Sequence, residues 1–263
     1  MRSRRGAELL AAMGLLTRLP LGRYLPGPDE VDQAQSVRAY PLVGGVVGLI
    51  AAMGYALASE AGMSPLLAAF WALVVNGLVT GALHEDGLAD SADGLAGGQS
   101  VTRRLEIMRD SRIGSYGALA LMLSLGVRGA AIAALGIPGV VAAGVVSAGM
   151  LGRMAMVLVM WRGEPARRDG LAAGIGPIPR HAAWTAAGSA ALVCVVLLGV
   201  VRAVLVLAVT GGLAWWWRGV GRRAIGGYTG DTLGGLEIIV ECVVLSLLAG
   251  VMAKGGFRVM GSG

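Results

Sequence analysis

Residues 138–161 read PGVVAAGVVSAGMLGRMAMVLVMW, an apolar run that contains a single charge. About 20 such residues in a helix cross the hydrocarbon core of a bilayer, so this run predicts a membrane span. Six further runs of this kind occur at 41–59, 65–83, 116–136, 182–201, 203–217 and 236–253. The sequence therefore predicts an all-α fold, a polytopic transmembrane helix bundle of about seven spans, as a single integral membrane domain over residues 1–263.

Composition supports the membrane class. Of the 263 residues, 56% are hydrophobic and only 14% are charged, with a mean hydropathy of +0.71, and so few charges cannot cover the surface of a soluble domain. The basic excess is almost entirely arginine, and no basic helix or aromatic-interleaved patch indicates nucleic acid as a partner. The stretch 7–19 is short and interrupted by Arg18, which predicts an amphipathic or interfacial segment rather than a span.

The basic residues predict the orientation of the bundle. With seven spans, 17 of the 22 basic residues fall in the N-terminal region and the loops 84–115, 162–181 and 218–235, which share one side, and three fall on the other. Such asymmetry places the first side in the cytoplasm and the protein in the cytoplasmic (inner) membrane. Arg128 and Arg153 lie within spans, so each should face the bundle or a polar cavity, and Arg153 could reach a carboxylate.

Acidic residues are concentrated in two short segments. The first begins HEDGLADSADG (84–94), and Asp86, Asp90 and Asp93 would share one helical face if the second span continued as a helix. Like charges on one face repel, and hard divalent cations bind such carboxylates. The spacing i, i+4 recurs at Glu106/Asp110 and at Glu237/Glu241. The alternative is a solvated acidic face paired with arginines, which Arg103, Arg104, Arg109 and Arg112 could supply.

Arginines beside carboxylates also suit a phosphate-bearing substrate, because guanidinium groups pair with phosphate oxygens. The glycine-rich stretch IGGYTGDTLGG (225–235) could let the backbone approach a phosphate. It lacks the lysine of a P-loop, so hydrolysis of a nucleoside triphosphate is not indicated.

Three motifs together resemble those of the cobalamin synthase family, also called adenosylcobinamide-GDP ribazoletransferase. They are HEDGLADSADG (84–94), RLEIMRDSRIG (104–114) and GYTGDTLG (227–234), with LTRLP (16–20) and YPLVG (40–44) resembling the N-terminal signatures. The resemblance implies that adenosylcobinamide-GDP is joined to α-ribazole or α-ribazole 5′-phosphate with release of GMP, in a magnesium-dependent reaction at the lipid bilayer. It leaves open a homo-oligomer or association with other enzymes of the pathway. Glu85, Gly97, Gly98 and Gly235 depart from the expected pattern without removing a motif carboxylate.

The motifs and the resemblance together assign roles to specific residues, with direct phosphoryl transfer as the mechanism and loops 84–115 and 218–241 as the catalytic loops. The residues expected to bind Mg²⁺ are Asp86, Asp90, Asp93, Asp110, Glu237 and Glu241. The catalytic residues are expected to be Asp86, Asp90, Asp93, Asp110 and His84. The residues expected to bind substrate are Arg104, Arg109, Arg112, Thr229, Gly230 and Asp231.

Two other functions remain open at this point. The segment from Asp90 to Gly94 matches the start of the CDP-alcohol phosphotransferase signature, whose later half is not matched cleanly. A membrane enzyme of that type with another acceptor is the first alternative. A transporter, in which Arg128 and Arg153 would serve as gating or substrate sites, is the less favoured alternative. The acids lie at the membrane edge rather than at its middle.

Overall fold

A computed structural model describes residues 4–27 and 31–257, within which every regular element is a helix. Arg2 and Arg258, which the charge asymmetry includes, lie outside these residues. The α-helices are α1 (Arg4–Leu16), α2 (Gln33–Ser36), α3 (Tyr40–Glu60), α4 (Pro65–Thr80), α5 (Leu83–Gly97), α6 (Val101–Ile107), α7 (Ser115–Leu135), α8 (Pro138–Arg162), α9 (Leu171–Gly174), α10 (Arg180–Leu198), α11 (Val200–Ile225) and α12 (Gly230–Phe257). Two 3-10 turns, η1 (Gly22–Tyr24) and η2 (Val37–Ala39), complete the set. The predicted all-α class is confirmed.

The expected number of spans is confirmed as well. Six helical segments in the described residues are long and apolar enough to cross a membrane, namely α2 with α3, α7, α8, α10, α11 and α12. The seventh candidate is the pair α4 and α5, which is bent by 91°. The break between α10 and α11 falls at Gly199 rather than at Arg202, and α11 continues to Ile225, well beyond the predicted end at 217.

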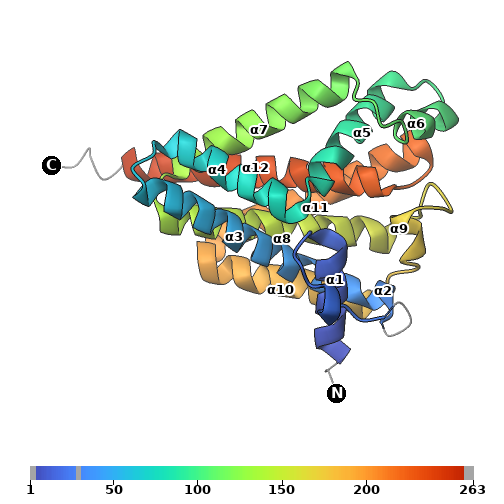
Figure 1. The fold of residues 1–263 in the computed structure, drawn as a ribbon, viewed down its shortest axis with the longest axis horizontal. Coiled ribbons are helices and arrows are strands. Elements are labelled where there is room, and N and C mark those ends of the chain that lie inside the picture. Colours follow the sequence, from blue (N-terminus) through green and yellow to red (C-terminus); the bar gives the residue numbers. More distant parts are fainter. Residues whose placement is uncertain (1–3, 28–30, 258–263) are drawn as a thin grey trace.

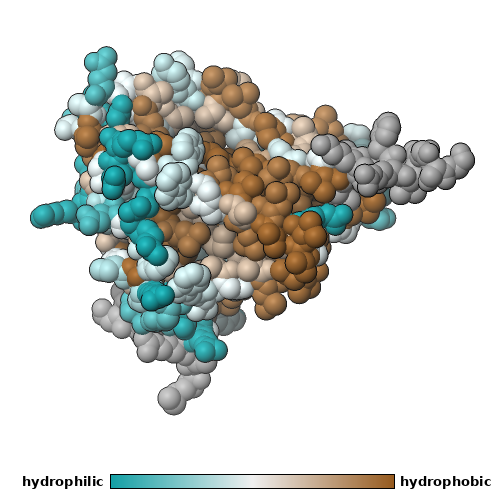
Figure 2. Space-filling model, turned by 180° about the vertical axis from the view of Figure 1, so that it is seen from behind, coloured by the Kyte–Doolittle hydropathy of each residue, from teal (hydrophilic) through white to brown (hydrophobic). Residues whose placement is uncertain are grey.

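The bundle has one polar end. We call the polar end the side formed by segments 81–114, 163–179 and 226–229, which connect the spans at the right of Figure 1. The connections at the opposite side are short turns at 61–64, 136–137 and 199. Figure 2 shows hydrophilic residues gathered at one end and a broad hydrophobic surface over the rest of this face. This arrangement fits a bundle whose long connections meet water on one side of a membrane.

The sharp bend after α4 separates the acidic segment from the second span. Gly81 and Ala82 both adopt left-handed backbone conformations, with φ of 66° and 55°, and Ala82 is the one non-glycine residue with positive φ in the described residues. Two consecutive left-handed residues end α4 and redirect the chain. The acids therefore lie on a separate helix, α5, and not on a continuation of the span.

The stretch 7–19, expected to be amphipathic or interfacial, folds largely as α1, which crosses the ends of neighbouring helices at a steep angle in Figure 1. Its residues Ala12 and Leu16 are buried in the core, and its Glu8 forms an ion pair with Arg38 in the turn before α3. This helix thus lies against the bundle at the polar end, where Leu16 reaches the cavity described below.

Candidate active site

Helices α5 and α12 cross closely because glycines face each other at the contact. A Cβ on Gly87 would lie 2.8 Å from the carbonyl oxygen of Asp231 and 3.2 Å from the Cα of Gly234. A Cβ on Gly234 would in turn lie 3.3 Å from the Cα of His84. Small residues of this kind let two helix backbones approach closely. The crossing brings the acidic face of α5 next to the first turn of α12.

Four of the predicted acidic residues lie near this crossing. Asp90 lies within electrostatic range of Asp86, Asp93 and Asp231, and Asp86 also acts on Asp231. Asp86 is exposed, Asp90 is half-buried, and neither carboxylate forms a hydrogen bond with another described residue. Close, unpaired carboxylates repel one another, so this arrangement favours a bound cation.

Arg167 balances part of this charge. Its Nη2 donates a hydrogen bond of 2.5 Å to Oδ2 of Asp231, and its guanidinium also acts on Asp90. The sequence had assigned Arg167 no role beyond the sidedness of its loop. The signal that could have found it is the cluster Arg167-Arg168 between two spans, on the same side as the acidic motifs.

Thr229 begins α12 as its N-cap. Its hydroxyl accepts a hydrogen bond from the backbone N–H of Thr232, at 3.2 Å, and the Thr232 hydroxyl accepts one from the backbone N–H of Thr229, at 2.8 Å. This reciprocal pattern resembles a capping box and fixes the first turn of the helix. The same Thr229 hydroxyl donates to Asp231 Oδ2 at 3.2 Å, so this residue orients Asp231 as well.

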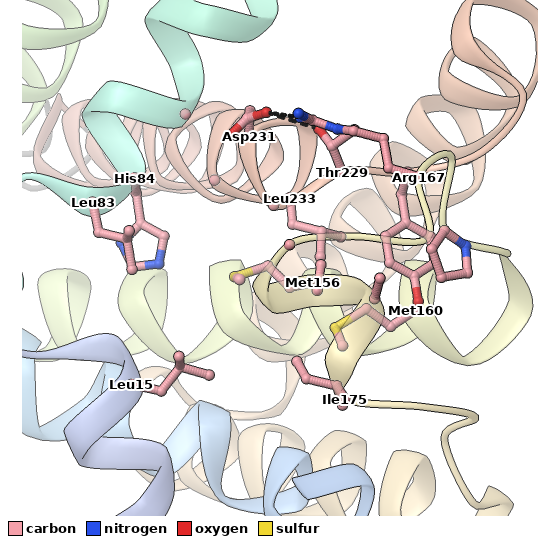
Figure 3. A pocket seen from close by; sticks show the side chains of 18 of the residues that line it. Leu15, Leu83, His84, Met156, Met160, Arg167, Ile175, Thr229, Asp231 and Leu233 are labelled. Atoms are coloured by element: carbon pink, nitrogen blue, oxygen red, sulfur yellow. Dashed lines mark hydrogen bonds and ion pairs between the residues drawn. The ribbon is translucent and has the colours of Figure 1, made fainter. Parts of the chain in front are cut away.

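A cavity of about 240 Å³ opens beside these groups at the polar end. In Figure 3 the Asp231–Arg167 pair and Thr229 lie along one wall, Met156 and Met160 rise from α8, and Leu15 and Ile175 lie on the far side. His84 projects toward the space between α5 and α8. The polar residues in the lining are His84, Asp86, Arg167, Asp169, Thr229 and Asp231. The cavity thus combines three carboxylates and one arginine, which suit a phosphate together with a bound cation, with an apolar wall that suits an organic ring.

Asp93 is placed differently from its neighbours. It is buried, and its two oxygens accept hydrogen bonds from the backbone N–H groups of Gly114, at 2.7 Å, and Gly117, at 2.9 Å. These groups are the N-cap and third residue of α7, and Gly114 has no side chain that could cap its own helix. Asp93 caps α7 from another helix, so we leave it out of the proposed cation site.

The second predicted motif lies at the edge of this region. Asp110 is held by Arg112 through three side-chain contacts of 2.7 to 3.2 Å, and these hydrogen bonds lower the pKa of Asp110 to about 2. Arg109 pairs with Asp169, which lines the cavity, at 2.5 Å. Arg104 donates to the carbonyl oxygens of Gly98 and Ala224, both at 2.9 Å, and thereby ties α6 to α11. Of the three predicted substrate-binding arginines, only Arg109 is linked to the cavity.

The acids Glu237 and Glu241 belong to a buried network of charges. Arg153 pairs with Glu237 and, at 3.1 Å, with Glu241. Arg128 pairs with Glu241 at 2.9 Å and with Glu85 at 3.0 Å. Arg128 and Arg153 are almost completely buried, with 0% and 1% of their surfaces exposed, respectively. The prediction that they face the bundle is confirmed. One partner of Arg128 is Glu85, which is among the residues that depart from the expected pattern.

This network occupies the carboxylates that the spacing had assigned to metal, so we leave Glu237 and Glu241 out of the cation site. It also reaches the cavity, because Arg153 Nη2 lies 3.4 Å from Nδ1 of His84. His84 is buried, lines the cavity, and its Nε2 has no hydrogen-bond partner among the described residues. The network therefore fixes the position of the His84 ring through its Nδ1 atom.

The described residues do not form a complete metal cage. In this part of the chain, no three histidine, cysteine or carboxylate side chains converge closely enough to hold an ion. Asp86 and Asp90 nevertheless fit Mg²⁺, which proteins usually bind through one or two carboxylates together with water and substrate phosphates. A cation site here would be completed by a phosphate-bearing substrate.

Comparison with known proteins finds a matching family and several similar chains. The family model described as cobalamin-5-phosphate synthase matches residues 8–249. Proteins named adenosylcobinamide-GDP ribazoletransferase are similar over most of their length. That from Bradyrhizobium diazoefficiens is 42% identical, covering 92% of this chain and 93% of its own, and that from Mesorhizobium japonicum is 42% identical, covering 90% and 91%. That from Sinorhizobium medicae is 39% identical, covering 92% and 95%. No solved structure matches the chain significantly.

Proposed function

Because the chain belongs to the cobalamin-5-phosphate synthase family, we propose that it joins adenosylcobinamide-GDP to α-ribazole or α-ribazole 5′-phosphate with release of GMP. Family membership makes the protein a transferase of cobalamin biosynthesis. The observation that carries the detailed proposal is the cavity at the α5–α12 crossing, where Asp86, Asp231 and Arg167 face an apolar wall. Its charged groups suit a diphosphate, and its methionine and leucine side chains suit the aromatic base of ribazole.

The proposed reaction is a direct phosphoryl transfer. An acceptor hydroxyl oxygen forms a bond to the cobinamide-linked phosphorus while the bridging P–O bond to GMP breaks. Because α-ribazole 5′-phosphate carries phosphate at its 5′ position, the attacking group in that acceptor must be another ribose hydroxyl. Its proton passes to a carboxylate at the crossing, where Asp86 and Asp231 line the cavity.

The charged residues of the cavity have separate tasks in this proposal. Mg²⁺ held by Asp86 and Asp90 would neutralise negative charge on the diphosphate and on the departing GMP. Arg167 pairs with phosphate oxygens and, through Asp231, is positioned by the first turn of α12. His84, fixed by Arg153, offers its free Nε2 to a polar group of the substrate. Asp110 stays ionised in its ion pair with Arg112, and because neither residue lines the cavity we assign this pair no part in the transfer.

We further propose that the protein lies in the cytoplasmic membrane with its polar end toward the cytoplasm. The arginine distribution supports this orientation, because the connections with most basic residues remain inside. The substrates would then reach the cavity from the cytoplasm, and the hydrophobic surface in Figure 2 would face the bilayer.

The test is product formation by the purified chain in detergent. With adenosylcobinamide-GDP, magnesium and either acceptor, GMP should be released, whereas omission of the acceptor or addition of a chelator should stop the release. Asp90→Asn should lower turnover by about 100-fold or more, because it removes charge that stabilises the transition state, without altering extraction or elution. Release of CMP from CDP-diacylglycerol with a small alcohol at a comparable rate would refute the proposed substrate class.

A further inference from the structure

A second cavity, of about 260 Å³, lies at the polar end between the last turns of α8 and α11. It is distinct from the first cavity but shares Tyr228 with it. Three arginines line it, Arg162, Arg218 and Arg222, and Glu164 is the one carboxylate in the lining. Positive charge therefore predominates here, whereas carboxylates predominate at the α5–α12 crossing. A site of this composition suits an anion bound without a metal ion.

The guanidinium groups of this cavity are free to bind. Arg218 uses its Nε to donate to the carbonyl oxygen of Arg162, at 2.7 Å, which fixes the direction of its side chain. The guanidinium of Arg162 lies over the ring of Trp161, 4.0 Å from the ring centroid. Beyond these contacts, the three guanidinium groups form no hydrogen bond with the described residues. Their remaining N–H groups match the oxygens of a phosphate, which several arginines bind in a defined geometry.

The walls of the cavity are rigid. Gly221 and Gly227 lie in close contact, and Gly227 also packs against the carbonyl of Glu164, so no side chain fits between these backbones. Trp217 is buried, and its indole N–H donates to the carbonyl oxygen of Thr232 at 2.7 Å. The same Thr232 belongs to the capped first turn of α12. A phosphate bound here would therefore contact a preformed site on elements that also build the first cavity.

A short pairing of two chain segments separates the cavities. Tyr228 donates its backbone N–H to the carbonyl oxygen of Glu164 at 3.0 Å, and Ala166 donates to the carbonyl oxygen of Tyr228 at 2.8 Å. Arg162 precedes this pairing and faces the second cavity, whereas Arg167 follows it and faces the first. A ligand with two polar ends could thus engage both sites around Tyr228.

We propose that the arginine cavity binds the 5′-phosphate of α-ribazole 5′-phosphate, so that Arg162, Arg218 and Arg222 determine how tightly this acceptor binds relative to α-ribazole. This inference rests on the proposed function. The diphosphate of the other substrate requires the carboxylates that hold a cation, and these lie at the first cavity. A phosphomonoester carries a charge of about −1.5 to −2 on one group, which suits three guanidinium groups without a cation.

The test compares the two acceptors in the purified full-length chain with adenosylcobinamide-GDP and magnesium in excess. Arg218→Gln and Arg222→Gln should each raise KM for α-ribazole 5′-phosphate by about 10-fold or more, the effect of losing a charge-assisted hydrogen bond, and leave KM for α-ribazole unchanged. Arg223→Gln is the matched control, because Arg223 is an exposed neighbour that does not line the cavity. It should alter neither KM.

Other outcomes overturn the inference. Equal changes for both acceptors, or no change for either, would show that the arginines do not bind the acceptor phosphate. An anionic lipid headgroup has the same chemistry, so the assays are repeated with and without phosphatidylglycerol vesicles. A response to this lipid that both variants lose, with acceptor preference intact, would assign the cavity to lipid. Absence of GMP release by the unaltered protein with either acceptor would instead refute the proposed function itself.

Discussion

Replacement of Asp93 by asparagine tests whether its carboxylate has a structural role, in contrast to the carboxylates that we propose bind a cation. Asp93 accepts hydrogen bonds from the N–H groups of Gly114 and Gly117, which begin α7, and it lies in a buried position. Asparagine keeps one oxygen acceptor, but its amide NH₂ would face the second N–H group. One hydrogen bond is then lost, the charge that favours a helix N-terminus is removed, and a buried donor is left without a partner.

The magnitude follows from these contacts. A hydrogen bond to a charged group contributes about 1.5–3 kcal/mol, and an unsatisfied buried donor costs about 1–3 kcal/mol, two effects that overlap. We expect Asp93→Asn to lower the free energy of unfolding by about 2–4 kcal/mol. For a chain of this size that corresponds to a fall in the thermal midpoint of about 4–7 °C.

The assay is the temperature at which the detergent-solubilised protein ceases to elute as a single species, with turnover measured below that temperature. Asp90→Asn is the matched control, because Asp90 lies one turn earlier on α5 and forms no hydrogen bond with a described residue. The control should keep the midpoint of the unaltered protein and lose turnover. If Asp93→Asn instead keeps the midpoint and loses turnover as severely as Asp90→Asn, Asp93 is a cation ligand and the capping argument is wrong.

Two further predictions follow from the network and the orientation of the bundle. Arg153→Met should destabilise the protein by about 3–5 kcal/mol, because it leaves Glu237 and Glu241 buried without that partner. Addition of Glu237→Gln should restore part of the thermal midpoint. An unchanged midpoint in Arg153→Met would contradict the network. In oriented membrane vesicles, a membrane-impermeant thiol reagent should label Thr102→Cys in α6 only from the cytoplasmic side and Ala61→Cys, at the opposite turn, only from the other side. The reverse pattern would overturn the proposed orientation.

The spans could be predicted from the sequence because a bilayer imposes a length on each apolar run. The bend after α4 could not, since it depends on Ala82 adopting a left-handed conformation that alanine rarely takes. The extent of α11 was also underestimated. Its last turns carry Arg218, Arg222 and Arg223, which ended the apolar run in the sequence but remain helical at the polar end.

The acidic face of α5 could be predicted from spacing, but the partners of each acid could not. Asp86, Asp90 and Asp93 are equivalent in the helical pattern, yet only Asp93 meets the start of a helix that begins 22 residues later. The prediction for Arg104 rested on its proximity to acids in sequence, whereas its guanidinium contacts backbone carbonyls at Gly98 and Ala224. Such distinctions arise from tertiary packing, which the local sequence does not encode.

Glu237 and Glu241 show that an acidic i, i+4 pair inside a membrane span needs basic partners. The same i, i+4 spacing occurs on α5, where the carboxylates of Asp86 and Asp90 are at least partly accessible to solvent. On α12 the pair is buried, and a charge there is tolerated only with a partner. The sequence contained those partners, because Arg128 and Arg153 lie within spans and needed carboxylates at a similar depth. Charges within spans should therefore be matched to one another first, and only the acids left over at the membrane edge considered as cation ligands. By this rule Asp86 and Asp90 remain, because neither forms an ion pair with an arginine among the described residues, and Asp86 lines the cavity.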